Sequence, residues 1–108
     1  MIKQVIIPVL FLYTIGMCAC FAGSDMTGKE VFEKKCSYCH GPDENNPGTR
    51  QLALSRGKDK AILERRNDLT GEYIRYIVRH GLMSMPAFVP TDVSEQHLDD
   101  LIKYITSD

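Results

Sequence analysis

The pattern of apolar and polar positions predicts a chain built of helices, with no stretch of the alternation that half-buried strands show. Two helices are marked most clearly. The first begins after the N-cap residue Thr70 and ends at Gly81, and the second begins after the N-cap residue Ser94. Each has one apolar face with helical spacing, formed by Tyr73, Ile74, Ile77 and Val78 in the first and by Leu98, Leu101, Ile102 and Ile105 in the second.

A third helix is predicted further towards the N-terminus. Thr27 and Glu30 have the spacing of a capping box, so the helix begins at Thr27 and carries Val31 and Phe32 inward. A glycine on a helix face allows a second helix to cross closely. We therefore expect this helix to pack against the last one through two matching faces, formed by Gly28 and Phe32 and by Leu101 and Tyr104.

The remaining segments connect these helices. Proline, asparagine and glycine make 41–48 a polar loop, and a short helix is predicted over 49–56, where Gly57 stops it. Residues 59–66 add a further turn or two, and 82–92, with two prolines and no periodicity, is a loop. The sequence therefore predicts an all-α fold.

The N-terminus has a different composition. Lys3 precedes an almost uncharged apolar run over 5–22, and small residues stand near its end, which is typical of a secretory signal cut after Ala22. Two alternatives stay open: cleavage and lipidation at Cys20, or an uncut run whose 18 residues are just enough to span a bilayer. All three place the domain formed by 23–108 outside the cytoplasm, and we expect it in the periplasm.

Charge and size narrow the possible functions. Without residues 1–22 the chain has 86 residues and a formal net charge of −2, because Lys3 is the only charged residue lost. Such a chain gives no support to binding of nucleic acid or of an anionic membrane surface. A domain of this size has a small core and usually needs additional stabilisation, for example from a disulfide, a metal ion or a buried cofactor. Cys36 and Cys39 are too close in sequence to staple the fold by pairing with each other.

Five residues, Cys36-Ser37-Tyr38-Cys39-His40, form the attachment signature of one c-type haem. In this arrangement the two thiols form thioether bonds to the porphyrin, and His40 binds the iron. A zinc site completed by His80 or His97 is the alternative, but the chain lacks the second pair of ligands that such sites contain. We expect the other ring nitrogen of His40 to donate a hydrogen bond to a backbone carbonyl, for which Pro47 is the candidate.

Met85 is the candidate for the opposite axial position of the iron. It stands in the loop that follows the helix ending at Gly81, and Pro86 stiffens the backbone after it. Met83 competes for the same role, with packing at the haem edge as its alternative, because methionine fills irregular gaps. Four arginines are candidates for pairing with the haem propionates: Arg50, Arg56, Arg65 and Arg66. Solvated charge is the default role of each, and Arg50 is the first choice for the pairing.

An iron held by His40 and Met85 has a definite chemical character. The soft thioether favours Fe(II), and both axial positions are filled, so the pattern predicts an electron carrier and not an enzyme. A haem enzyme or gas sensor in which Met85 is displaced remains the alternative. The rest of the chain offers no convincing catalytic constellation.

Taken together, these motifs resemble those of class I cytochromes c. The likeness rests on Gly28 with Phe32, Cys36 to His40, Pro47-Gly48, Met85-Pro86, and Leu101 with Tyr104. The segments 73–81, 85–88, 47–49 and 63–69 are similar to the small cytochrome subunits of the p-cresol methylhydroxylase and eugenol hydroxylase flavocytochromes. The resemblance implies a small helical domain wrapped around a covalently bound haem. It also implies redox-protein partners, among them an FAD-containing dehydrogenase from which electrons pass singly towards the respiratory chain.

Overall fold

The computed structural model describes residues 25–107. The predicted signal segment, residues 1–22, lies outside the described residues, so its three alternative fates stay predictions. Within residues 25–107, no helix has both the length and the apolar character needed to cross a membrane.

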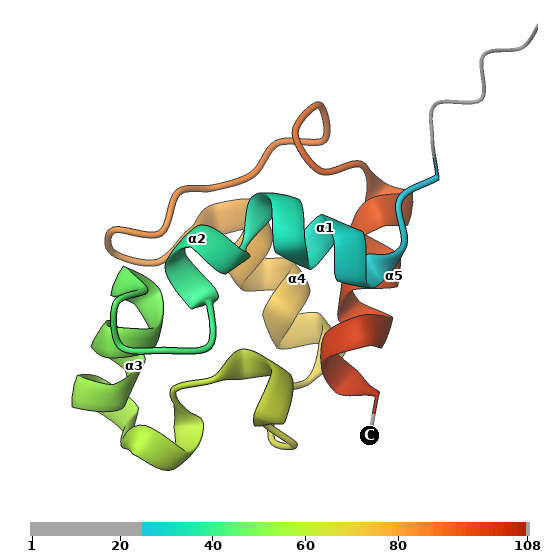
Figure 1. Ribbon diagram of the computed structural model, residues 1–108. Coiled ribbons are helices and arrows are strands. Elements are labelled where there is room, and N and C mark those ends of the chain that lie inside the picture. Colours follow the sequence, from blue (N-terminus) through green and yellow to red (C-terminus); the bar gives the residue numbers. More distant parts are fainter. Residues whose placement is uncertain (1–24, 108) are drawn as a thin grey trace, which may run out of the picture.

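The described part of the chain consists of five α-helices and two short 3₁₀ turns (Figure 1). No strand forms between residues 25 and 107, where the nearest approach to one is an isolated bridge between Leu82 and Met85. The all-α prediction is confirmed. In chain order the elements are α1 (Gly28–Lys35), α2 (Ser37–His40), α3 (Pro47–Arg56), η1 (Lys58–Lys60), η2 (Leu63–Arg65), α4 (Gly71–His80) and α5 (Glu95–Thr106).

The helices begin where their caps predict. At α1 the Thr27 hydroxyl accepts a hydrogen bond from the Glu30 amide at 3.3 Å, and the Glu30 carboxylate accepts one from the Thr27 amide at 2.8 Å. Thr70 caps α4 and Ser94 caps α5 in the same way, each through its hydroxyl oxygen. These bonds satisfy amide groups that have no partner inside the helix.

One boundary differs from the prediction. Helix α3 begins at Pro47, two residues earlier than predicted, because proline is well suited to the first position of a helix even where it suggests a turn. The further turns expected over 59–66 are the two 3₁₀ turns η1 and η2. The Tyr104 hydroxyl of α5 donates a hydrogen bond to the Glu64 carboxylate, which ties η2 to the last helix.

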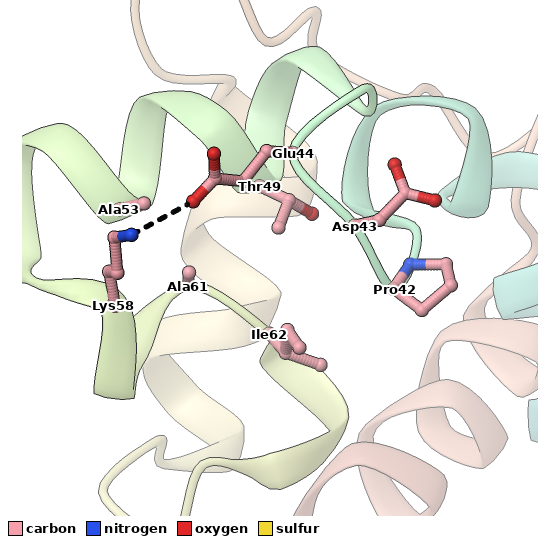
Figure 2. Close-up of a pocket in the computed structure, with 8 residues that line it drawn as sticks. All are labelled: Pro42, Asp43, Glu44, Thr49, Ala53, Lys58, Ala61 and Ile62. Atoms are coloured by element: carbon pink, nitrogen blue, oxygen red, sulfur yellow. Dashed lines mark ion pairs between the residues drawn. The ribbon is translucent and has the colours of Figure 1, made fainter.

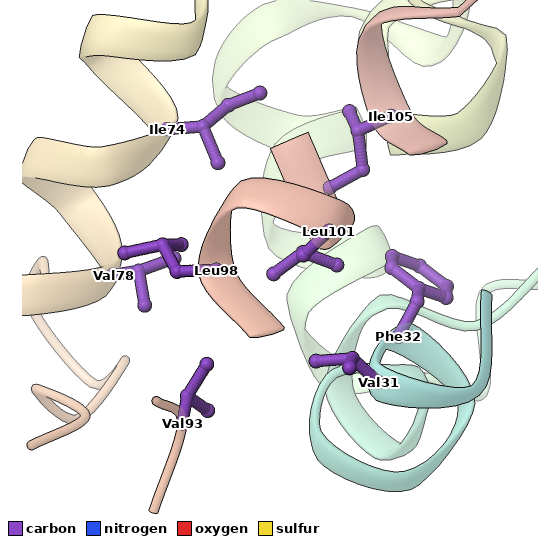
Figure 3. Packing of buried hydrophobic residues seen from close by; sticks show 8 residues of the cluster. All are labelled: Val31, Phe32, Ile74, Val78, Val93, Leu98, Leu101 and Ile105. Atoms are coloured by element: carbon purple, nitrogen blue, oxygen red, sulfur yellow. The ribbon is translucent and has the colours of Figure 1, made fainter. Parts of the chain in front are cut away.

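A single apolar cluster lies where α1, α4 and α5 meet (Figure 3). Leu98 and Leu101 of α5 are at its centre with 0 % and 1 % of their surface exposed, and Val31 of α1 is equally buried. Val93, from the loop before α5, packs into the same cluster. The remaining members are Phe32, Ile74, Val78 and Ile105.

Helices α1 and α5 cross as closely as the sequence predicts. A Cβ atom added to Gly28 would overlap the backbone carbonyl of Asp100 and lie 2.8 Å from the Cβ atom of Tyr104. The Phe32 and Tyr104 rings meet beside this point, with 5.9 Å between their centroids. The close approach therefore depends on the absence of a side chain at residue 28.

We predict that Gly28→Ala lowers the free energy of unfolding by about 1–3 kcal/mol, the usual cost of overpacking. Alanine would favour the helix by about 1 kcal/mol, but the added methyl group has no space at the crossing. Urea denaturation measures the change. Lys35→Ala, at an exposed position of the same helix, is the control and should leave stability nearly unchanged. A Gly28→Ala protein as stable as the parent would contradict the close crossing.

Candidate functional site

One apolar cleft is lined by residues of all five helices, of η2 and of the loop that follows α4. Eleven of its fifteen lining residues are aliphatic, phenylalanine or methionine. Helix α4 contributes most of one wall, where Tyr73 and Ile77 line the cleft while Ile74 and Val78 line it and also reach the core. The apolar face predicted for α4 is therefore divided between the core and the cleft.

The cleft brings together three of the four predicted site residues. Cys36, at the end of α1, His40, in α2, and Met85, in the loop after α4, all line it. Cys39 is exposed and is not part of the lining, but it lies on the same helical turn as Cys36. The Cys39 and His40 amides both donate to the Cys36 carbonyl, at 3.2 and 2.8 Å, which forms this turn.

Side chains from the following segment hold this turn in place. The Asn46 amide group donates to the carbonyls of Ser37 and Tyr38, at 3.2 and 3.1 Å. The Thr49 hydroxyl, in α3, is buried and donates to the Gly41 carbonyl at 2.6 Å. These bonds fix the backbone on both sides of Cys39 and His40.

The His40 ring is mostly buried. Burial lowers its pKa, so the ring is neutral near pH 7 and keeps a lone pair for a metal. Its Nδ1 atom is buried and has no hydrogen-bond partner among the described residues. The predicted bond to the Pro47 carbonyl is thus not formed: Nδ1 lies against Gly48 instead, where an added Cβ atom would be 3.0 Å from it.

Both cysteines carry free thiols. Burial raises the pKa of the Cys36 thiol to about 11, and the nearby Cys39 adds to the effect. The thiol is therefore protonated near pH 7 and is not a preformed thiolate ligand.

The zinc alternative required His80 or His97 to join the cysteines. Between residues 25 and 107 no group of three or more histidine, cysteine or acidic side chains is placed to hold a metal ion. His80 is instead exposed and stacks on Tyr76, with 4.1 Å between ring centroids, and its Nδ1 atom is 2.8 Å from the Tyr76 carbonyl oxygen. The structure thus does not assemble the zinc site.

The two methionines occupy opposite sides of one tight turn. The turn is closed by hydrogen bonds between Leu82 and Met85, of 3.1 and 2.9 Å. Met83 is at its tip, with a left-handed backbone (φ 53°) and 91 % of its surface exposed, whereas Met85 lines the cleft. The structure thus brings Met85, and not Met83, into the candidate site.

Gly81 fixes the start of this turn. It ends α4 with φ 73°, a conformation that favours glycine, and an added Cβ atom would be 2.9 Å from the Ala87 amide nitrogen. The backbone from Met85 to Ala87 therefore packs directly against the end of α4.

Arg66 is the one permanently charged residue in the lining of the cleft. Its side chain is only 12 % exposed and donates two hydrogen bonds to the Asp68 carboxylate, both of 2.8 Å. These bonds raise the pKa of Arg66 and lower that of Asp68. The sequence favoured Arg50 for a position near the cofactor, but Arg50 is exposed and does not line the cleft.

A second hollow lies beside the 41–46 loop, between α3 and η1 (Figure 2). Glu44 and Lys58 face each other at 3.5 Å across it, both largely exposed. Because this pair is neutral and no other charged group except Asp43 lines the hollow, it offers no set of converging groups for chemistry.

The residues of the apolar cleft fit a haem. Apolar walls suit the porphyrin, a neutral histidine and a thioether suit the iron, and a cysteine lies at the lining with its partner on the same turn. An all-α domain that carries the Cys36–His40 motif beside such a cleft belongs to the class of c-type cytochrome domains, whose cofactor is haem c. Residues 23–105 match the family described as "Cytochrome C oxidase, cbb3-type, subunit III", and the chain belongs to this family.

Two kinds of relative support this assignment. The chain is 31% identical over 81 residues to the "4-cresol dehydrogenase [hydroxylating] cytochrome c subunit" of Pseudomonas putida. That match covers 75% of this chain but only 59% of the relative's length. A crystal structure of p-cresol methylhydroxylase and another with substrate bound each match 75% of this chain, with 31% identity and a TM-score of 0.54. The matches cover 92% and 90% of the respective chains, so the predicted cytochrome fold is confirmed.

We predict that Thr49→Val lowers the free energy of unfolding by about 1–3 kcal/mol, because the buried Gly41 carbonyl would lose its partner. Urea denaturation of the haem-containing protein measures this change. Ser55→Ala removes a comparable bond of the same helix, from an exposed hydroxyl to the Gln51 carbonyl, and should change stability by less than about 0.5 kcal/mol. Equal effects of the two substitutions would contradict the anchoring role of Thr49.

Proposed function

We propose that this protein is a periplasmic electron carrier with one haem c. Cys36 and Cys39 attach the haem covalently, and His40 and Met85 are the axial ligands of its iron. The observation that carries this proposal is that the Cys36–His40 turn and Met85, which are 45 residues apart in the chain, line one apolar cleft.

The chain's own residues suit this role. When bound, the haem supplies one-electron Fe(II)/Fe(III) chemistry. The apolar lining excludes water and lowers the local dielectric constant, and burial keeps His40 neutral. Met85 occupies the position at which an enzyme would need an open site, which supports a carrier without catalytic activity of its own.

The proposed electron donor is a flavin-dependent dehydrogenase, and the acceptor belongs to the respiratory chain. Support comes from the Pseudomonas putida relative, which is the cytochrome c subunit of a dehydrogenase. The periplasmic location rests on the apolar run of residues 5–22, read as a signal peptide cut after Ala22. A membrane association is proposed only if that segment is retained or lipidated.

We predict that Met85→Ala abolishes the weak far-red absorption band of a methionine-ligated ferric haem. It should also lower the reduction potential by at least about 100 mV, within the range of about 0.8 V over which axial ligands act. Visible spectroscopy and a redox titration measure the two effects. Met83→Ala is the matched control, because Met83 is two residues away and outside the cleft, and it should change neither.

Other outcomes have clear meanings. A shift with Met83→Ala and none with Met85→Ala would reassign the ligand. A high-spin spectrum of the parent protein, or rapid carbon monoxide binding by its reduced form, would favour the haem enzyme or gas sensor. A protein that matured without colour and bound zinc would exclude haem altogether.

Arg66 has a place in this proposal. A haem carries two propionates, and an apolar cleft needs a positive or hydrogen-bonding group to accept them. After Cys36 and His40 have been assigned, Arg66 and Tyr73 are the remaining polar residues of the lining. We assign the propionate edge of the haem to these two residues, with Asp68 holding the Arg66 guanidinium in position.

We predict that Arg66→Gln lowers the reduction potential by tens of millivolts, because loss of a positive charge favours Fe(III); about 1.4 kcal/mol corresponds to about 59 mV for one electron. Asp68→Asn should raise it, since a negative charge is removed. Redox titration measures both. Arg65→Gln is the control, because Arg65 is exposed and outside the cleft. Equal shifts for Arg65 and Arg66 would indicate a general charge effect and reject the assignment.

A further inference from the structure

The loop of residues 82–93 carries Met85 and has little regular structure of its own. It leads from α4 to α5 along one edge of the molecule in Figure 1, where it is drawn in orange. Within it, the Asp92 and Val93 amides donate to the Val89 carbonyl, at 2.9 and 3.1 Å. Apart from the turn at Leu82, its backbone contact with α4 is a bond from the Phe88 amide to the Val78 carbonyl, of 2.8 Å.

The side chain of Arg79, in α4, adds a second connection. Its Nη1 atom donates to the carbonyls of Phe88 and Val93, at 3.0 and 2.9 Å, and so joins two points of the loop that are five residues apart. Its Nη2 atom donates to the Glu95 carboxylate at 2.6 Å, in the first turn of α5. One guanidinium thus links α4, both parts of the loop and α5.

Burial makes these bonds costly to lose. The Arg79 side chain is 16 % exposed, and both loop carbonyls that it meets are partly buried. Without the guanidinium these carbonyls would lack a partner and could find one only by turning towards water. The loop would then open on the side of Phe88, which is three residues from Met85 and packs against the same core.

We infer that Arg79 is a positioning residue that holds Met85 in the cleft. The inference rests on the proposed function, in which Met85 is an axial ligand. With Arg79 in place, the backbone from Met85 to Ala87 packs against Gly81, and Phe88 is held both by the Val78 carbonyl and by Arg79. Loss of the guanidinium leaves the bond to Val78 but weakens the attachment of the loop after Met85, and this lets a competing ligand replace the thioether.

Arg75 provides a matched control. It lies one turn earlier in α4 and also pairs with Glu95, at 2.9 Å, and with Asp99. Among residues 25–107 it donates to the Glu95 and Asp99 carboxylates and to no loop carbonyl, and its side chain is 41 % exposed. Removing Arg75 therefore takes away a similar charge from the same helix and leaves the attachment of the loop intact.

The test is an imidazole titration of the haem-containing ferric protein, in which binding is measured from the change in the haem absorption spectrum. Arg79→Gln should bind imidazole at about a tenfold lower concentration than the parent, as expected for loss of a charge-assisted hydrogen bond. Arg75→Gln should bind it at the parent's concentration. Parent-like binding by Arg79→Gln, or equal increases in both variants, would overturn the inference. Urea denaturation of both variants separates loop opening from a general loss of stability.

Met85→Ala in the same titration separates failure of the inference from failure of the proposed function. If Met85 is the ligand, Met85→Ala tightens imidazole binding, and adding Arg79→Gln to it has no further effect. Imidazole binding unchanged by Met85→Ala would reject both Met85 ligation and the role of Arg79. If Arg79→Gln does not mature, Arg79→Lys replaces it; intermediate binding supports the inference and parent-like binding overturns it.

Discussion

The core and the cofactor cleft of this protein are built from the same side chains, and the rest of the structure depends on this sharing. Five of the eight core residues, Phe32, Ile74, Val78, Leu101 and Ile105, also line the cleft. A domain as small as the one formed by residues 25–107 has too little apolar surface to make a large core by itself. A bound porphyrin would pack against the sides of these residues that face the cleft, so binding of the cofactor and folding of the chain depend on the same apolar contacts.

Local signals allowed most of the helical framework to be predicted. Thr27, Thr70 and Ser94 cap the helices that they were expected to cap, because a cap depends on residues within one turn. The crossing at Gly28 was also predictable, since two apolar faces with a glycine between them restrict how helices can meet. The start of α3 was missed because a Pro-Gly pair suits both a turn and a first helical turn, and the sequence alone does not decide between them.

The site residues whose chemistry follows from their residue type could be predicted from the sequence. Those whose role depends on their position in the folded chain could not. The motif at Cys36 and the Met85-Pro86 pair are read directly from the sequence, and the structure brings Cys36, His40 and Met85 to one cleft. Arg66 reaches the same cleft from a distant segment, so its proximity to the site is a tertiary property. Arg79 left no signal, because its loop partners are backbone carbonyls, which every residue type possesses. The expected bond from His40 to Pro47 likewise depended on a local geometry that the loop does not adopt.

Gly81 has two structural roles: it ends α4, and the backbone that follows Met85 packs against it. The position of the Met85 thioether in the cleft therefore depends on the length of α4. One residue inserted into α4 would rotate its end by about 100° and advance it by about 1.5 Å, carrying the methionine with it. A change in one of these two segments therefore requires a matching change in the other, whereas the outer tip of the turn, where 91 % of the Met83 surface is exposed, is free of this constraint.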